Sequence, residues 1–135
     1  DEDYSNYAQF VEEQKIDDIV SFKGPLQLEE TIEYYHNADA FVLYSKYETF
    51  SIVLAEALAT GTPVITTKVG IASNLSSEFG VNVEHNNDTE LAKVMSSFIE
   101  QQMKFDKVQL REYAKQFSNE RILNCWTDLI ERHVR

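Results

Sequence analysis

Two carboxylates stand out because of the residues around them. From Thr49 to Thr67 the only charged residue is Glu56, and Glu48 comes just before this apolar stretch. A carboxylate in such surroundings is costly unless it is paired, hydrogen-bonded or part of a binding site. Eight positions separate Glu48 from Glu56, a little over two helical turns, so both can face one crevice. We therefore expect a ligand site here, and a buried acid satisfied by a backbone amide or a lysine is the structural alternative.

Paired carboxylates suggest general acid and base catalysis, as in glycoside hydrolysis. The sequence does not favour that chemistry, because no second pair, aromatic sugar platform or poised nucleophile accompanies Glu48 and Glu56. The three histidines, His36, His85 and His133, are far apart and lack the spacing of metal ligands. We therefore expect neither a hydrolase nor a metal site.

The elements around the two glutamates predict where a ligand would bind. Ala40–Leu43 is an apolar run typical of a parallel strand covered on both faces. Ser51–Thr60 predicts a helix buried on most of its circumference, ended by Gly61 and Pro63. Glu48 then lies at the carboxyl end of a strand, where open α/β sheets bind ligands.

The remaining segments alternate between strand and helix patterns before ending in helices alone. Predicted strands are Ile19–Phe22, Val64–Thr67 and Val81–Val83, and predicted helices are Tyr4–Gln14, Leu28–Asn37, Thr89–Gln102, Lys107–Phe117 and Asn119–His133. This order predicts an α/β fold with a parallel sheet, flanking helices and a helical C-terminal tail. With 135 residues, we expect one domain across residues 1–135.

Composition narrows the classes of partner. The net charge of −11 argues against nucleic acid, because binding phosphates needs clustered Lys and Arg. The sequence has no apolar run long enough to span a membrane. Its one cysteine, Cys125, excludes an intramolecular disulfide and fits a reducing compartment, so we expect a cytoplasmic protein. Cys125 is expected to pack on a helix face beside Trp126.

A family resemblance rests on the residues around this pair. Glu48 and Glu56 are separated by seven residues and followed by Ala57-Leu58-Ala59-Thr60-Gly61-Thr62-Pro63-Val64-Ile65. This string resembles the E-x7-E signature of retaining, GT-B-type glycosyltransferases, and more narrowly of family four among them. Supporting segments lie before and after this string, in the expected order across Ile19 to Val94: Ile19–Gly24, Tyr35–Leu43, Val69–Ile71, Gly80–Val83 and Asp88–Ala92. The resemblance implies a Rossmann-like sheet that forms part of the GT-B C-terminal domain.

The resemblance also implies roles for single residues. Glu48 would hydrogen-bond hydroxyls of the donor sugar, which makes it the candidate catalytic residue. Thr49, Phe50 and Ser51 would present backbone amides to the sugar and diphosphate, where a helix N-terminus suits phosphate. Glu56 would accept hydrogen bonds from the two ribose hydroxyls, and its two oxygens suit a vicinal diol.

Other positions in the string are matched less directly. The base-contacting segment of the family corresponds to the loop from Lys23 to Leu26, with Gly24, Pro25 and Leu26 as candidate donor-binding residues. Ser51 stands where many family members have Gly or Pro. Ser73 stands where many have Glu, and we assign it no role.

The implied function is the donor-binding part of a glycosyltransferase that moves a sugar with retention of configuration. The donor would be a UDP- or GDP-linked sugar, with no cofactor or metal. The acceptor, a sugar, lipid or polysaccharide, would bind a missing N-terminal domain, so the chain alone is expected to be inactive. Polysaccharide biosynthesis fits such an enzyme. The rival hypotheses are a noncatalytic nucleotide-binding module and an α/β protein-interaction domain.

Overall fold

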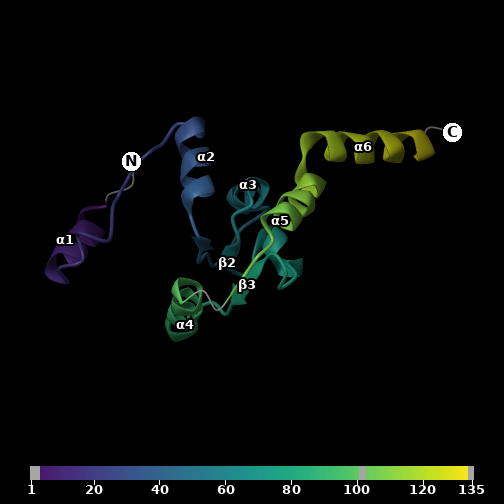
Figure 1. Cartoon of the computed structure of the whole chain (residues 1–135). Helices are drawn as coiled ribbons and strands as arrows, with labels where there is room; N and C mark the ends of the chain where they lie inside the picture. Colours follow the sequence, from purple (N-terminus) through teal and green to yellow (C-terminus); the bar gives the residue numbers. More distant parts are fainter. Residues whose placement is uncertain (1–3, 101–102, 134–135) are drawn as a thin grey trace. The chain divides into compact units, whose positions relative to one another are not determined.

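The computed structural model describes residues 4–100 and 103–133 and contains two compact units, Asp1–Thr31 and Ile32–Arg135. The first unit contains α1 (Ser5–Glu13) and the following loop, and α2 (Leu28–Asn37) begins at its end and continues into the second unit (Figure 1). Both helices lie where hydrophobic spacing predicts them. The expectation that residues 1–135 form one domain stays a prediction.

The predicted strand at Ile19–Phe22 is wrong, because residues 19–22 form no strand. The chain turns instead, and the amides of Ile19 and Val20 both donate to the carbonyl of Ile16, at 3.1 and 3.0 Å. Ile19 is 77% exposed. A short apolar run becomes a strand only when a neighbour completes its hydrogen-bond ladder, and the local turn takes those bonds here.

The second unit is built on a parallel sheet, as expected. Its strands are β1 (Phe41–Leu43), β2 (Val64–Thr67) and β3 (Gly80–Val83), in the order β1-β2-β3, with Val64 beside both Phe41 and Gly80. All four residues of the central strand β2 are buried, and all four are β-branched, which suits a covered strand. The predicted α/β class with a Rossmann-like sheet is confirmed.

The helices of this unit follow the strands in sequence. They are α3 (Ile52–Thr60), η1 (Gly70–Asn74), α4 (Asp88–Ile99), α5 (Lys107–Ala114), η2 (Lys115–Phe117) and α6 (Asn119–His133). Helix α3 packs against α5, and α4 packs on β2 and β3. The short helix η1 was not predicted, because its sequence lacks a helical hydrophobic period. Within residues 4–100 and 103–133 no helix combines the length and the apolar character needed to cross a membrane.

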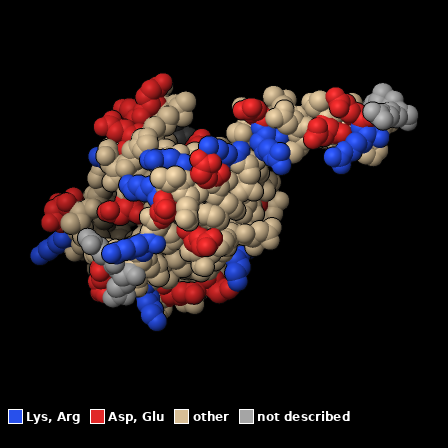
Figure 2. Space-filling view, turned by 45° about the vertical axis from the view of Figure 1, so that its right-hand side comes forward, with Lys and Arg blue, Asp and Glu red and all other residues tan. Residues whose placement is uncertain are grey.

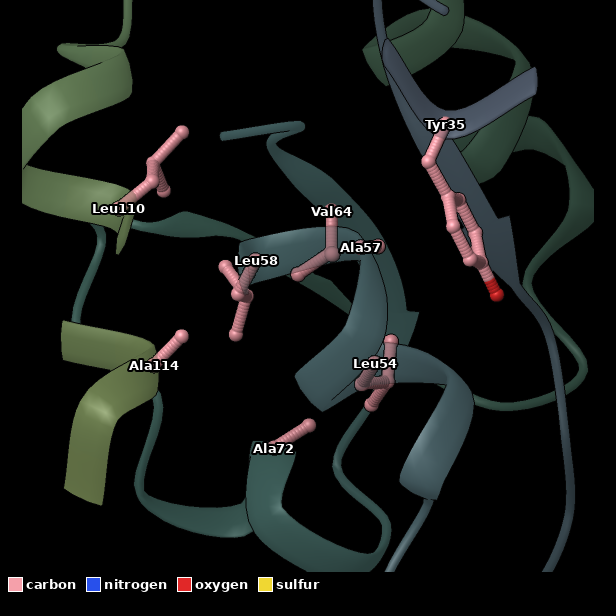
Figure 3. Close-up of a cluster of buried hydrophobic side chains, with 8 residues drawn as sticks. All are labelled: Tyr35, Leu54, Ala57, Leu58, Val64, Ala72, Leu110 and Ala114. Atoms are coloured by element: carbon pink, nitrogen blue, oxygen red, sulfur yellow. The ribbon is translucent and has the colours of Figure 1, made fainter. Parts of the chain in front are cut away.

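The core lies between α3, α5 and the sheet (Figure 3). Its buried members are Tyr35, Leu54, Ala57, Leu58, Val64, Ala72, Leu110 and Ala114. The predicted burial of α3 on most of its circumference is wrong. Only a stripe of α3 is buried, since Ile52 is 64% exposed and Val53 is 37% exposed.

Helix α6 also differs from expectation. The predicted packing of Cys125 beside Trp126 is wrong, because Cys125 is exposed and Trp126 is 60% exposed. Every side chain of α6 is exposed. On the face that Figure 2 shows, Lys and Arg side chains lie interspersed with Asp and Glu.

Candidate functional site

The candidate site begins in the loop that follows β1, residues 44–51. This loop is held at two points by the end of β2 and the segment after it. The Thr67 hydroxyl donates to the carbonyl of Ser45, and the Ile71 amide donates to the carbonyl of Phe50 at 3.0 Å. The loop therefore has a fixed path into α3 although it has no regular structure.

Ser51, the residue just before α3, has an uncommon backbone conformation. Its φ of 70° and ψ of 64° lie in the left-handed region, which disfavours residues other than glycine. Its side chain is 4% exposed, and its Oγ is buried without a hydrogen-bond partner. Backbone strain and an unpartnered buried hydroxyl at one residue are features that often mark a functional position.

Gly70 makes the close approach to this residue possible. A Cβ at Gly70 would lie 2.4 Å from Ser51 Oγ and 2.6 Å from the carbonyl oxygen of Phe50, and Gly70 itself has a φ of +50°. No larger residue fits without displacing the loop. We call Phe50, Ser51 and Gly70 the Ser51 corner.

The Ser51 corner opens on the N-terminal turn of α3. The Ser51 side chain makes no capping hydrogen bond to this turn, and the first amides of an α-helix lack intrahelical acceptors. The helix dipole adds a partial positive charge there. Such a turn can bind an anionic group such as phosphate.

Glu56 lies further along α3 and is half-buried. The Tyr35 hydroxyl, from α2, donates to Glu56 Oε2 at 3.4 Å. Burial and the neighbouring Glu56 carboxylate raise the pKa of Tyr35 to about 12. The structural alternative for Glu56 named a lysine or a backbone amide as its partner, and the partner in the structure is a tyrosine. Sequence reasoning missed Tyr35 as a site residue, and the only signal was its place in the Tyr35–Leu43 segment of the resemblance.

A hollow of about 830 Å³ lies beside Glu56. Its lining is largely apolar and includes Phe50 before α3, Glu56 and Phe117 of η2. Phe50 and Phe117 pack edge to face, with ring centroids 5.8 Å apart. Pockets for small molecules have volumes of roughly 300–1,000 Å³ and similar linings, so the hollow can accept one.

Two cations also line this hollow, and both already have partners. The Arg111 guanidinium donates to the carbonyl of Thr60 through Nη2, at 3.0 Å. The Lys115 ammonium pairs with Glu112 at 2.6 Å. Among these three charged groups only Lys115 has a counter-ion, since Arg111 and Glu56 are each hydrogen-bonded to an uncharged group.

The structure brings some of the predicted site residues together and not others. Phe50 and Glu56 line the same hollow, whereas Glu48 is half-buried in the loop and is not among the lining residues. Thr49 is exposed next to it. The predicted base-contacting residues Gly24, Pro25 and Leu26 belong to the first unit, where Gly24 has a φ of +64° and open space around its Cα.

In the part of the chain that the structure describes, no three His, Cys, Asp or Glu side chains gather as a metal site would require.

Comparisons with known proteins connect this geometry to a family. The model of the family described as glycosyl transferases group 1 matches residues 1–117. The D-inositol 3-phosphate glycosyltransferase of Paenarthrobacter aurescens is 31% identical over 109 residues, which are 79% of this chain and 25% of that protein. A glycogen synthase of Mycobacterium tuberculosis is 47% identical over 49 residues, which are 36% of this chain and 12% of that protein.

A solved structure supports the same relationship. The sucrose-phosphate synthase from Thermosynechococcus elongatus superimposes with a TM-score of 0.73 at 26% identity, covering 96% of this chain and 33% of that one. This chain thus spans a quarter of the length of the inositol phosphate enzyme and a third of the length of the sucrose-phosphate synthase. Because the family match covers most of the sequence and the fold agrees, the chain belongs to the group 1 family of glycosyl transferases.

Proposed function

We propose that this chain binds the nucleotide-sugar donor of a retaining glycosyltransferase of the GT-B type, within family four. Membership of the glycosyl transferase family supports sugar transfer. The observation that carries the donor-binding role is the Ser51 corner, where a strained residue with an unpartnered buried Oγ precedes an uncapped helix. A UDP- or GDP-linked sugar has a diphosphate that suits such a helix start.

In this proposal the diphosphate lies at the N-terminal turn of α3. The amides after Ser51 would donate to its oxygens, and the Ser51 Oγ would gain the partner that it now lacks. Charge on the diphosphate increases as the bond to the sugar breaks. Fixed donors aimed at such charge lower the barrier, because they need no reorganisation during the reaction.

The two carboxylates would bind the ribose and the sugar of the donor. Glu56, with one oxygen already bonded to Tyr35, would accept hydrogen bonds from the ribose hydroxyls. Glu48 precedes the loop residues Thr49, Phe50 and Ser51, so we place it against hydroxyls of the sugar, where it orients the reacting carbon. Gly24, Pro25 and Leu26 would contact the base.

The acceptor belongs to a different part of the proposed enzyme. We propose that a sugar, lipid or polysaccharide acceptor binds an N-terminal domain outside these 135 residues, and that transfer requires both parts. The similar proteins include a glycogen synthase, which fits a role in polysaccharide biosynthesis. The single cysteine, Cys125, supports a reducing, cytoplasmic setting.

Titration of the 135-residue chain with UDP, GDP, UDP-glucose and GDP-mannose, monitored by NMR, tests the proposal. We expect amide shifts to concentrate at residues 48–56 and at Gly70, with further shifts when the sugar is present. The same shifts with and without the sugar would favour a noncatalytic nucleotide-binding module. Absence of binding by all four compounds would favour a protein-interaction domain.

A further inference from the structure

The environment of Tyr35 fixes its ring in place. The ring is 7% exposed and packs edge to face on Phe41 of β1, with centroids 5.3 Å apart. The Thr62 hydroxyl donates to the Tyr35 carbonyl at 2.6 Å. Figure 3 shows the ring at one side of the core cluster, with its hydroxyl at the outer end. The position of the Tyr35 hydroxyl is therefore fixed by contacts from β1 and from the turn between α3 and β2.

That hydroxyl meets a carboxylate with few other partners. Among the described residues, the Tyr35 hydroxyl is the one hydrogen-bond donor recorded for the Glu56 side chain, at 3.4 Å from Oε2. The two cations of the neighbouring hollow are bonded to the Thr60 carbonyl and to Glu112. Glu56 thus has one oxygen with a donor and one without.

The protonation state of Tyr35 suits a permanent donor. Burial, followed by the charge of Glu56, raises the pKa of Tyr35 to about 12, so the hydroxyl keeps its proton at physiological pH. The distance of 3.4 Å exceeds the usual range for O–H···O bonds of about 2.5–3.0 Å. Hydrogen bonds at binding sites are often long before the ligand arrives and shorten in the complex.

We propose that Tyr35 is a positioning residue for Glu56, whose hydroxyl holds Oε2 and orients Oε1 towards the ribose hydroxyls of the donor. This inference rests on the proposed function, because it assigns Glu56 to the ribose. Tyr35 itself touches no part of the donor. It acts by fixing the orientation of the Glu56 carboxylate, which has no other hydrogen-bond donor among the described residues.

The test uses Tyr35→Phe, which removes the hydroxyl and keeps the buried ring. The probes are UDP and GDP, whichever binds the 135-residue chain more tightly, and the 2′,3′-dideoxy form of that nucleotide. We expect Tyr35→Phe to weaken the ribonucleotide about threefold to tenfold and to leave the dideoxynucleotide unchanged. A role in packing alone would weaken both nucleotides equally or neither, and either result would overturn the inference.

Two variants separate this inference from the proposed function. Glu56→Gln should weaken the ribonucleotide, and in that background Tyr35→Phe should have little further effect. If Glu56→Gln has no effect, the ribose-binding role of Glu56 is wrong and the inference falls with it. If Glu56→Gln weakens binding and Tyr35→Phe does not, only the inference about Tyr35 is wrong. Tyr34→Phe, at the exposed neighbouring position of α2, is the matched control and should change neither affinity.

A second measurement needs no substitution. NMR of the unaltered chain with tyrosine labelled at Cζ reports on the Tyr35 hydroxyl directly. We expect its signal to move when the ribonucleotide binds, because the hydrogen bond to Glu56 shortens, and to stay in place with the dideoxynucleotide. Equal movement with both nucleotides would show that Tyr35 does not sense the ribose and would overturn the inference.

Discussion

The two ends of α3 both contain a residue in the left-handed region, yet they are built differently. At the C-terminal end this residue is Gly61, with a φ of 84°, and the amides of Gly61 and Thr62 donate to carbonyls of the last turn. The Arg111 guanidinium bonds the Thr60 carbonyl as well. At the N-terminal end the residue is Ser51, which has a side chain and a buried Oγ without a partner.

The difference separates a structural end from a functional one. Glycine adopts the left-handed region without a steric penalty, and the amides of Gly61 and Thr62 terminate the helix with hydrogen bonds to its last turn. A serine in that region is strained by about 1–2 kcal/mol, and its orphan hydroxyl adds to that penalty. Strain of this kind persists where the surrounding structure enforces it, and it gathers at binding sites. A ligand at the Ser51 corner would give the Ser51 Oγ the hydrogen-bond partner that the protein does not supply.

The largest expected effect comes from closing the Ser51 corner. Gly70→Ala should lower the free energy of unfolding by about 2–4 kcal/mol, because the new Cβ meets Ser51 Oγ and the Phe50 carbonyl at a positive φ. Gly61→Ala is the matched change near the other end. Its Cβ would meet side-chain atoms of Arg111 and Lys107 at 3.1–3.2 Å, so about 1–2 kcal/mol is expected. Urea unfolding measures both, and equal losses would remove the difference between the ends.

The two ends of α3 also differ in how well the sequence predicts them. The C-terminal end was predicted from Gly61 and Pro63, because helix termination is encoded locally. The start of the helix was predicted to within one residue, at Ser51 rather than Ile52, but the left-handed conformation of Ser51 was not. Ser51 lies against Gly70, which is distant in sequence and whose lack of a Cβ allows the close approach. The resemblance marked this position as one where many members have Gly or Pro, and the observed φ of 70° gives the physical reason for Gly.

The sheet and the site show the same limit. The strands β1, β2 and β3 were predicted from short runs of apolar or β-branched residues. Ile19–Phe22 is a similar short run and forms no strand, because such a pattern does not say whether a partner strand is present. Tyr35 likewise reads as a core aromatic, and its contact with Glu56 across 21 positions of sequence needs the fold.

The next largest effect concerns nucleotide affinity. Glu56→Gln keeps one acceptor oxygen but loses the charge of the bonds to ribose, which are worth roughly 1.5–3 kcal/mol. The dissociation constant of the nucleotide sugar should rise about tenfold to a hundredfold. Isothermal titration calorimetry measures this change. Gly61→Ala should reduce stability without changing affinity, whereas Glu56→Gln should reduce affinity without changing stability. Lower stability of Glu56→Gln with unchanged affinity would make Glu56 a structural acid.

Glu48 should distinguish the sugar from the nucleotide. Glu48→Ala is expected to leave the affinity for bare UDP or GDP unchanged and to weaken the nucleotide sugar about tenfold, the value of a hydrogen bond to a charged group. In a protein that joins this chain to an acceptor domain, kcat should fall as well, because an interaction made in the transition state lowers kcat. Glu33→Gln, an exposed change on α2, is the control. Equal losses for nucleotide and sugar nucleotide would place Glu48 against the nucleotide.

The smallest expected effect tests whether Ser51 is strained for the sake of a ligand. Ser51→Gly relieves about 1–2 kcal/mol of left-handed strain and loses about 0.5–1 kcal/mol to the greater freedom of the unfolded chain. For the backbone alone, thermal unfolding should therefore show a gain of up to about 1.5 kcal/mol in stability. Ser51→Ala keeps the strain and removes only the orphan Oγ, so it separates the hydroxyl from the backbone. If the Oγ binds the diphosphate, both variants should weaken UDP or GDP by a similar factor, although both are more stable: the alanine variant loses the orphan hydroxyl, and the glycine variant loses the hydroxyl and the backbone strain. A stability gain in Ser51→Gly without loss of nucleotide affinity would show that the strain at this end of α3 serves no ligand.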